Sequence, residues 1–143
     1  MNRAVIDASV VLKWYLADED LGSQALLVLE KFLSGELALI APSLLEYEVM
    51  NGLVIAQRKG RINDEVILEA GEGFLSLAIE QKTLSGSISE ALHFCRIYHR
   101  SLYDASYLAL AKKENIPLIT AHKGLYDAVK KDFQQLMWLG DFI

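Results

Sequence analysis

The sequence predicts one α/β domain, with helices on both faces of a central, mostly parallel sheet of four or five strands. Short apolar runs alternate along the chain with longer segments of helical periodicity, which is the pattern of α/β proteins. The 143 residues are the size of one ordinary domain, and 52% of them are hydrophobic, enough for a sizeable core. No linker, repeat or biased segment divides the chain, so residues 1–143 are treated as a single domain.

The predicted strands are short apolar runs that end at polar or turn-forming residues. Pro42 is expected to end one of them, because proline removes a backbone donor. We expect strands at residues 4–6, 37–40, 117–120 and 136–138, with a short further strand at residues 83–84. The segments between them are long enough for crossover helices, so the sheet is expected to be mostly parallel.

The predicted helices have apolar residues at helical spacing and recognisable residues at their ends. Gly60 is expected to end one helix and Asn63 to cap the next, in which Gly71 and Gly73 favour a kink. The helices are expected over residues 8–16, 20–34, 43–59, 64–80, 87–98 and 102–114. They would cover both faces of the sheet.

The composition excludes several classes of protein. The single cysteine, Cys95, excludes a disulfide framework and a multi-cysteine zinc site, and we interpret it as a small buried hydrophobic residue. With 14 Lys and Arg against 19 Asp and Glu, the net charge is −5, so nucleic acid binding through bulk positive charge is not expected. No apolar run reaches the length of a signal-peptide core or a membrane span. We therefore expect a cytoplasmic protein that makes no membrane contact.

Asp7 directly follows the predicted strand at residues 4–6. Parallel α/β sheets bind ligands beyond the carboxyl ends of their strands, which is where this carboxylate is expected to lie. The alternative is structural, because an aspartate before a helix commonly caps it by accepting hydrogen bonds from backbone N–H groups. Position alone does not separate the two interpretations.

The helix predicted over residues 43–59 contains two glutamates that its helical projection separates. Glu48 falls inside the apolar arc, whereas Glu46 lies at the edge and is expected to be a solvated charge. A carboxylate on a buried face costs free energy unless it is paired or bound to a metal ion. Asn51, one turn on, is a candidate hydrogen-bond partner for Glu48, and a buried Lys or Arg is the alternative partner.

Asp104 and His122 are two further candidates. Asp104 aligns with Leu108 and Ala111 on the core face of its helix, although the segment from Ser101 also fits a capping pattern at a helix N-terminus. His122 follows a predicted strand, where the alternative is an ordinary polar loop residue.

Carboxylates gathered at one end of a sheet repel one another unless a cation neutralises them. Mg²⁺ or Mn²⁺ suits such a site, because these ions prefer oxygen ligands and are often held by few carboxylates with water completing the coordination. An ion of this kind lowers the pKa of a bound water and stabilises charge on a phosphate. The carboxylates therefore point to phosphoryl chemistry.

Four segments of the chain resemble, in order, the motifs of the PIN domains, and within that family the small ribonuclease toxins of VapBC toxin–antitoxin pairs. Val5–Val10 resembles the opening hydrophobic-Asp-x-Ser/Thr motif, and Ala41–Leu53 the Pro…Glu-Val-x-Asn-x-Leu helix. Leu102–Ala111 resembles the third motif, and Pro117–Lys123 the last, usually Leu-hydrophobic-Thr-Ala-Asp. Each motif alone is weak, but the four together cover nearly the whole chain. The resemblance implies a PIN-like three-layer α/β/α fold.

The resemblance also implies the roles of individual residues. The catalytic residues and metal ligands would be Asp7, Glu48 and Asp104, with Mg²⁺ or Mn²⁺ as the ion. Ser9 and Thr120 would support these ligands by hydrogen bonds without binding the ion themselves. Asn51 would support Glu48 in the same way.

His122 departs from the family pattern, which usually has an aspartate at this position. Imidazole is a poorer ligand than carboxylate for Mg²⁺ and suits Mn²⁺ better. The departure puts in question a fourth metal ligand at His122, and with it the activity. Asp127 would compensate if a local helix turned it inward.

The resemblance implies a metal-dependent endoribonuclease, the toxin of a toxin–antitoxin pair, with RNA as substrate and a cognate antitoxin protein as partner. The alternative is a non-catalytic or weakly active PIN-like module that binds RNA or protein, because His122 replaces the usual acid. A third class, the aspartate-based phosphohydrolases with Asp7 as nucleophile, requires a second aspartate two residues on, where Ser9 stands.

Several basic and aromatic residues near the motifs are candidates for contacts with RNA. Candidate phosphate contacts are basic residues near the motifs: Lys13, Arg58, Lys59, Arg61 and Lys123. A solvated helix end explains the cluster at residues 58–61 equally well. Trp14 and Tyr15 are candidates for base stacking, with core packing as the alternative for Trp14.

A homodimer is expected from the helix over residues 43–59. Tyr47, Met50 and Val54 lie opposite its core arc, and such a second apolar face must be covered by another chain or by the helix at residues 64–80. The resemblance adds the dimer independently, because PIN toxins commonly dimerise.

Overall fold

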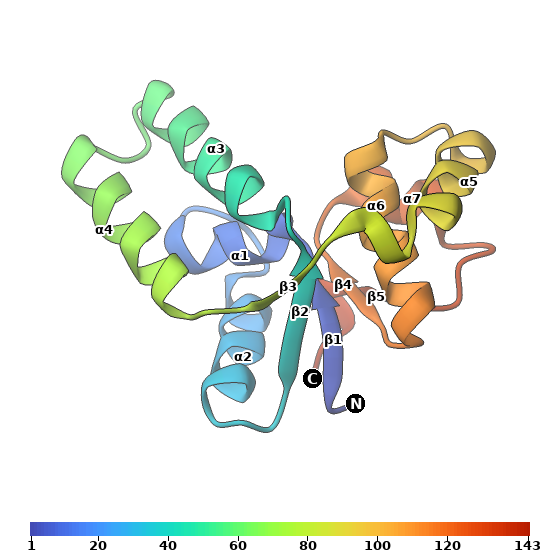
Figure 1. The fold of residues 1–143 in the computed structure, drawn as a ribbon. Helices are drawn as coiled ribbons and strands as arrows, with labels where there is room; N and C mark the ends of the chain where they lie inside the picture. Colours follow the sequence, from blue (N-terminus) through green and yellow to red (C-terminus); the bar gives the residue numbers. More distant parts are fainter.

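An entirely parallel five-stranded sheet runs through the centre of the computed structural model, which describes residues 1–143 (Figure 1). Its strands are β1 (Arg3–Ile6), β2 (Ala38–Pro42), β3 (Glu80–Lys82), β4 (Leu118–Thr120) and β5 (Leu136–Trp138). Their order across the sheet is β3-β2-β1-β4-β5. The predicted α/β class and the parallel sheet are confirmed.

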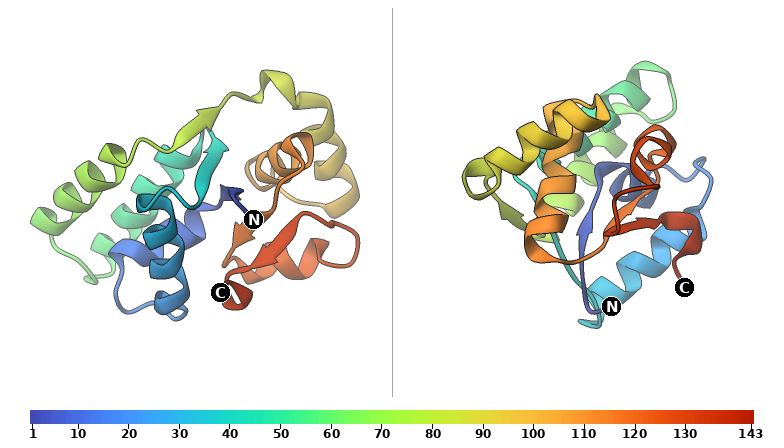
Figure 2. Two further views of the ribbon diagram at one scale, coloured as in Figure 1. Left: turned by 90° about the horizontal axis from the view of Figure 1, so that it is seen from below. Right: turned by 90° about the vertical axis from the view of Figure 1, so that its right-hand side faces the viewer.

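Helices cover both faces of the sheet (Figures 1 and 2). On one face lie α1 (Ala8–Tyr15), α2 (Gly22–Leu33), α3 (Leu45–Arg58) and α4 (Asp64–Ser76). On the other lie α5 (Ile88–Tyr98), α6 (Leu102–Glu114) and α7 (Lys123–Val129). From β1 the chain winds outward through β2 to β3, and then returns to β4 on the other side. Right-handed crossovers in opposite directions place their helices on opposite faces.

The strand order reverses between β1 and β4, which lie side by side with Val5 opposite Leu118 and Ile6 opposite Ile119. In open α/β sheets the carboxyl ends of the strands at such a reversal border a crevice that binds ligands. Asp7 leaves β1 at this point. Both chain termini lie at the opposite, amino end of the sheet (Figure 1).

The core forms where the sheet meets its helices. Ala4, Val5 and Ile6 are completely buried, as expected for a central strand that is covered on both faces. Trp14 packs against the core and donates a hydrogen bond from Nε1 to the backbone oxygen of Ala25 at 2.7 Å. Core packing is therefore the correct interpretation of Trp14.

The strand predicted at residues 83–84 is wrong. The strand is β3, Glu80–Lys82, and a 3₁₀ turn begins at Leu84. Strand β3 forms the edge of the sheet and its side chains are half-buried or exposed, so it lacks the apolar run that marks the inner strands. Pro42 belongs to β2 as its last residue rather than standing outside it.

Helix α4 is shorter than predicted and ends at Ser76. Asn63 caps it as expected, by accepting a hydrogen bond from the backbone N–H of Val66 at 2.9 Å. The helix continues through Gly71, where a Cβ atom would lie 2.8 Å from Cε of Met50 on α3. Gly71 thus permits close packing of α3 on α4, which covers part of the apolar face predicted for a dimer.

Helix α7, over residues 123–129, was not predicted from the sequence and has only 7 residues. Cys95 is half-buried at the edge of the core rather than fully buried. None of the helices combines the length and apolarity that a membrane crossing needs.

Candidate active site

The Asp7 carboxylate is buried at the carboxyl end of β1, with 7% of the residue exposed. Asp7 occupies the N-cap position of α1, but its side chain makes no capping hydrogen bond. Its Oδ2 atom instead accepts hydrogen bonds from Thr120 Oγ1 at 2.6 Å and Ser9 Oγ at 3.0 Å. The capping interpretation of the Asp7 side chain is therefore wrong.

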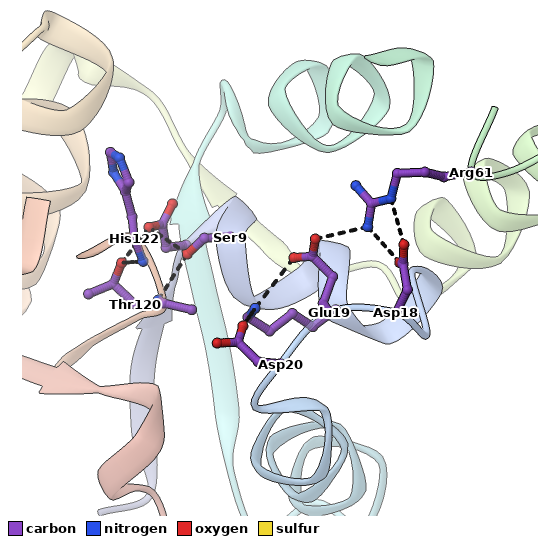
Figure 3. Close-up of polar contacts among 10 residues, drawn as sticks. Ser9, Asp18, Glu19, Asp20, Arg61, Thr120 and His122 are labelled. Atoms are coloured by element: carbon purple, nitrogen blue, oxygen red, sulfur yellow. Dashed lines mark hydrogen bonds and ion pairs between the residues drawn. The ribbon is translucent and has the colours of Figure 1, made fainter. Parts of the chain in front are cut away.

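The two hydroxyls are themselves held by the backbone that follows β4. Ser9 Oγ accepts a hydrogen bond from the N–H of Ala121 at 2.9 Å, and Thr120 Oγ1 accepts one from the N–H of His122 at 3.0 Å. Each hydroxyl thus has its proton directed at the Asp7 carboxylate. Figure 3 shows Ser9, Thr120 and His122 together at this end of the sheet. The structure places Ser9 and Thr120 where the sequence motifs predicted their support of Asp7.

Glu48 faces the same region from α3. Its Oε1 atom accepts a hydrogen bond of 2.6 Å from the hydroxyl of Tyr107, a buried residue of α6. No Lys or Arg pairs with Glu48, so the buried ion pair is excluded. Asn51 is exposed and makes no hydrogen bond with Glu48, because the tyrosine occupies that role. Tyr107 was not predicted, although it lies one turn after Asp104 on the same helix.

Asp104 is the third carboxylate, at the start of α6. Ser101 caps this helix by accepting a hydrogen bond from the Asp104 N–H at 3.1 Å, as the capping pattern predicts. The Asp104 carboxylate is separately engaged, because Arg100 approaches Oδ2 with Nε at 3.0 Å and Nη2 at 2.9 Å. Sequence analysis missed Arg100, although its spacing of four residues from Asp104 favours such a pair.

The three carboxylates share one electrostatic environment. Burial raises the pKa of Asp7, and the negative charge of Asp104 adds to that rise, against the hydrogen bonds from Thr120 and Ser9 and the charge of His122. Burial also raises the pKa of Glu48, with further increases from the charges of Asp7 and Asp104, while the Tyr107 hydrogen bond lowers it. Burial and the nearby carboxylates raise the pKa of Tyr107, which keeps its hydroxyl a donor.

The arrangement differs from a preformed metal site in one respect. No three acidic, histidine or cysteine side chains of the chain are close enough to hold one ion together. Arg100 engages one carboxylate and Tyr107 another. The donor set itself, three carboxylates of which Asp7 and Glu48 have raised pKa values, has the chemistry that a hard divalent cation requires.

His122 is exposed, and no close group of three potential metal ligands includes it. Its ring points away from Ser9 and Thr120 (Figure 3). A Cβ atom built on Gly124 would lie 3.5 Å from His122 Nε2 and 3.8 Å from Arg100 Nη2. His122 and Arg100 therefore border the same side of the acidic site.

A sequence model of the PIN domain family matches residues 4–131, which is most of the chain. This chain belongs to the PIN domain family. PIN domains are in general nuclease domains that use divalent metal ions.

A solved structure supports the fold of this PIN domain. The crystal structure of PAE2754 from Pyrobaculum aerophilum is similar, with 20% sequence identity and a TM-score of 0.65. The similarity covers 97% of this chain and 92% of that one. Among curated proteins the comparison finds no match.

Two basic residues predicted to contact phosphate are engaged elsewhere in this PIN domain. Lys13 is only 8% exposed and contacts Glu19 at 3.4 Å and Asp20 at 3.3 Å. Arg61 pairs with Asp18 at 2.6 Å and with Glu19 at 2.9 Å. Figure 3 shows these pairs as a group apart from Ser9 and Thr120. The pairs of Arg61 join the loop after α1 to the loop after α3, so both basic groups are already paired within the protein, and their contacts with phosphate stay a prediction.

The other basic candidates lie on the surface. Arg58 and Lys59 are exposed at the end of α3. Lys123 contacts Asp127 at 3.3 Å, and Lys130 contacts Asp127 at 3.2 Å. Because Asp127 is exposed and paired with these two lysines, the hypothesis that it turns inward to replace the missing acid is wrong.

We predict that Asp7→Asn stabilises the metal-free protein at pH 7. Because its pKa is raised in the folded protein, the Asp7 carboxyl is favoured there in its protonated form. As the pH rises through that pKa the carboxyl ionises and the free energy of unfolding falls, a loss that the neutral amide of asparagine avoids. In thermal melts with EDTA, the variant should melt above the wild type at pH 7, by about 2–4 °C for each kcal/mol gained. The gap should close as the pH falls toward 4.

Asp127→Asn is the matched control, because hydrogen bonding by Lys130 lowers the pKa of this exposed aspartate. That variant should gain no stability at pH 7. A lower melting temperature for Asp7→Asn than for the wild type at pH 7 would show that the ionised Asp7 carboxylate does not destabilise the metal-free protein.

We predict that Arg100→Ala strengthens metal binding, because the substitution frees the Asp104 carboxylate from its ion pair. Calorimetric titration with Mn²⁺ should give an increase in affinity of about 2- to 10-fold, the scale of a partly exposed ion pair. Arg96→Ala, an exposed arginine on α5, should leave the affinity unchanged. A weaker affinity in Arg100→Ala would mean that Arg100 supports the metal ligands rather than competing with the ion.

Proposed function

We propose that this protein is a metal-dependent endoribonuclease that hydrolyses phosphodiester bonds of RNA. The observation that carries the proposal is that Asp7, Glu48 and Asp104, from β1, α3 and α6, lie near enough for the charge of Asp104 to act on the other two, at the strand-order reversal. The charge of Asp104 raises the pKa of both Asp7 and Glu48, and neither of these two carboxylates is paired with a Lys or Arg, which favours a site that acts with a metal ion. Membership of a family of nuclease domains supports the same conclusion.

The same three residues are the ones that would hold Mg²⁺ or Mn²⁺. A bound divalent ion lowers the pKa of a water molecule and stabilises negative charge on the phosphate. The protein's own groups orient the ligands: Thr120 fixes the Asp7 carboxylate, and Tyr107 fixes that of Glu48. Such outer hydrogen bonds set the direction and basicity of metal ligands.

Arg100 adds a guanidinium and His122 an imidazole beside the acidic site, where both approach Gly124. A guanidinium forms strong, directional hydrogen bonds with phosphate oxygens. This placement supports binding of a phosphodiester next to the carboxylates, for which bulk charge offers no attraction because the net charge is −5.

The narrower role that we propose is that of the toxin in a toxin–antitoxin pair, with a cognate antitoxin protein as partner. The support for this role is the order and content of the four sequence motifs around Asp7, Glu48, Asp104 and His122. A homodimer stays a prediction of the same resemblance. The apolar face of α3 no longer requires a second chain by itself, because α4 already covers Met50 on that face.

A second candidate function is a PIN-like module that binds RNA or protein without cleaving it. Two observations favour it: His122 replaces the usual acid, and Arg100 forms an ion pair with Asp104. Cleavage of RNA by the purified protein distinguishes this candidate from the nuclease.

We predict that Glu48→Gln abolishes cleavage, whereas Glu46→Gln, on the same turn of α3, preserves it. Labelled RNA should be cut by the wild type with Mn²⁺ and not with EDTA, and Glu48→Gln should lose about 100-fold or more of the rate because a metal ligand loses its charge. Expression of the wild type, but not of Glu48→Gln, should arrest bacterial growth if the toxin role is correct. Equal cleavage by both variants, or cleavage in EDTA, would contradict the proposed function.

We predict that His122→Asp strengthens Mg²⁺ binding by about 10-fold, because a charge at position 122 acts on Asp7 and the substitution makes that charge negative. His122→Asn removes the imidazole without adding charge and should change the affinity less than about twofold. Calorimetric titrations of the three proteins give the comparison. Equal affinities of the Asp and Asn variants would show that position 122 faces away from the metal ion.

A further inference from the structure

We propose that Tyr47 and Tyr103 form a stacking subsite for an unpaired nucleobase, directly beside the carboxylates. This inference rests on the proposed function and deepens it by naming residues that bind the RNA. Neither tyrosine is among the acidic residues of the candidate active site, but each directly precedes one of them. Tyr47 precedes Glu48, and Tyr103 precedes Asp104.

The exposure of the tyrosines is the first observation. The chain has six tyrosines, and four of them are buried or half-buried. Tyr47 and Tyr103 are the two exceptions, with 81% and 62% of their surfaces exposed. A tyrosine is among the few side chains that offer a large apolar face together with a polar tip, so two such faces left open beside a candidate active site require an explanation.

Their position is the second observation. Tyr47 projects from α3 and Tyr103 from α6, and both line one surface pocket with Leu44, Glu48 and Asn51. The pocket thus combines two aromatic side chains, a carboxylate of the candidate active site and an amide. A base stacked on either ring would place its own phosphate close to Glu48.

The third observation is that the side-chain amide of Asn51 makes no hydrogen bond within the protein and that this residue is exposed in the same pocket. A carboxamide offers a donor and an acceptor to the edge of a base. The sequence led us to expect Asn51 as a partner of Glu48, and the structure leaves its amide free for a ligand because Tyr107 holds Glu48.

A second pocket continues from the first. It shares Leu44 and Tyr103, and Lys82 and Ser43 lie along its wall. Lys82, at the end of β3, has 42% of its side chain exposed and contacts Glu80 at 3.4 Å, an exposed ion pair that a phosphate of a neighbouring nucleotide would have to displace. Together the two pockets trace a path for a short single strand over Tyr103 and past Glu48.

The charge of the protein favours stacking over simple attraction. With a net charge of −5, the protein cannot rely on bulk attraction of phosphates. Stacking on an aromatic ring needs no charge and tolerates any base, because every base has a π face. An apolar face of another chain over these tyrosines would also cover the Glu48 carboxylate, which has no Lys or Arg partner within this chain, and such burial costs free energy.

The test uses the Asp7→Asn protein, so that RNA binding is measured without cleavage. The probe is a single-stranded RNA 12-mer of mixed sequence that carries 2-aminopurine, a fluorescent base whose emission is quenched by stacking. Tyr47→Ala and Tyr103→Ala should each weaken binding by about 10-fold, the scale of one lost stack, and should reduce the quenching. Tyr47→Phe and Tyr103→Phe keep the ring and should bind within about twofold of the parent.

Leu68→Ala is the matched control, because Leu68 is an apolar residue of α4 with 63% exposure that lines neither pocket. It should leave both binding and quenching unchanged. No binding of the 12-mer by Asp7→Asn, or equal binding and quenching in the Tyr→Ala and parent proteins, would overturn the subsite. A change of oligomeric state in the Tyr→Ala variants with unchanged RNA binding would assign the tyrosines to an interface between copies.

Failure of this proposal is distinguishable from failure of the proposed function. Cleavage by the wild type tests the nuclease, whereas quenching in the Asp7→Asn background tests the tyrosines alone. A nuclease with unaltered quenching in Tyr47→Ala and Tyr103→Ala would keep the activity and reject the subsite.

Discussion

The burial of the Asp7 carboxylate at the carboxyl end of β1 is the constraint on which the rest of the site depends. A buried carboxylate costs free energy unless donors surround it, and Thr120 and Ser9 supply two hydroxyl protons to one of its oxygens. Those hydroxyls are held in turn by the backbone that follows β4. The pairing of β1 with β4 at the centre of the sheet is therefore a requirement of the site as well as of the fold.

The same burial explains why the neighbouring charges are arranged as they are. Glu48 and Asp104 cannot approach Asp7 without raising the free energy of the ionised site, and each has a partner: Tyr107 for Glu48 and Arg100 for Asp104. A tyrosine hydroxyl and a guanidinium are both compatible with ionised carboxylates. They keep the site acidic and ordered while leaving its negative charge largely uncompensated, which is the condition for capturing a divalent cation.

The inner strands and the acidic residues could be predicted because their signals are local. Ala4–Ile6 is an apolar run followed by Asp7, and the helical projection alone separates Glu48 from Glu46. The missed features depend on contacts between distant segments: Tyr107 meets Glu48 across 59 positions, and Arg61 meets Asp18 across 43. Strand β3 was misplaced because an edge strand needs no apolar run.

Diffraction from crystals soaked in Mn²⁺, with anomalous differences recorded at the manganese edge, would show directly whether the three carboxylates hold a metal ion. We expect one anomalous peak bounded by the carboxylates of Asp7, Glu48 and Asp104, with Arg100 displaced from Asp104. Glu48→Gln crystals treated in the same way should show a weaker peak or none. A wild-type map without a peak at these residues, and with the Arg100–Asp104 ion pair intact, would contradict the account.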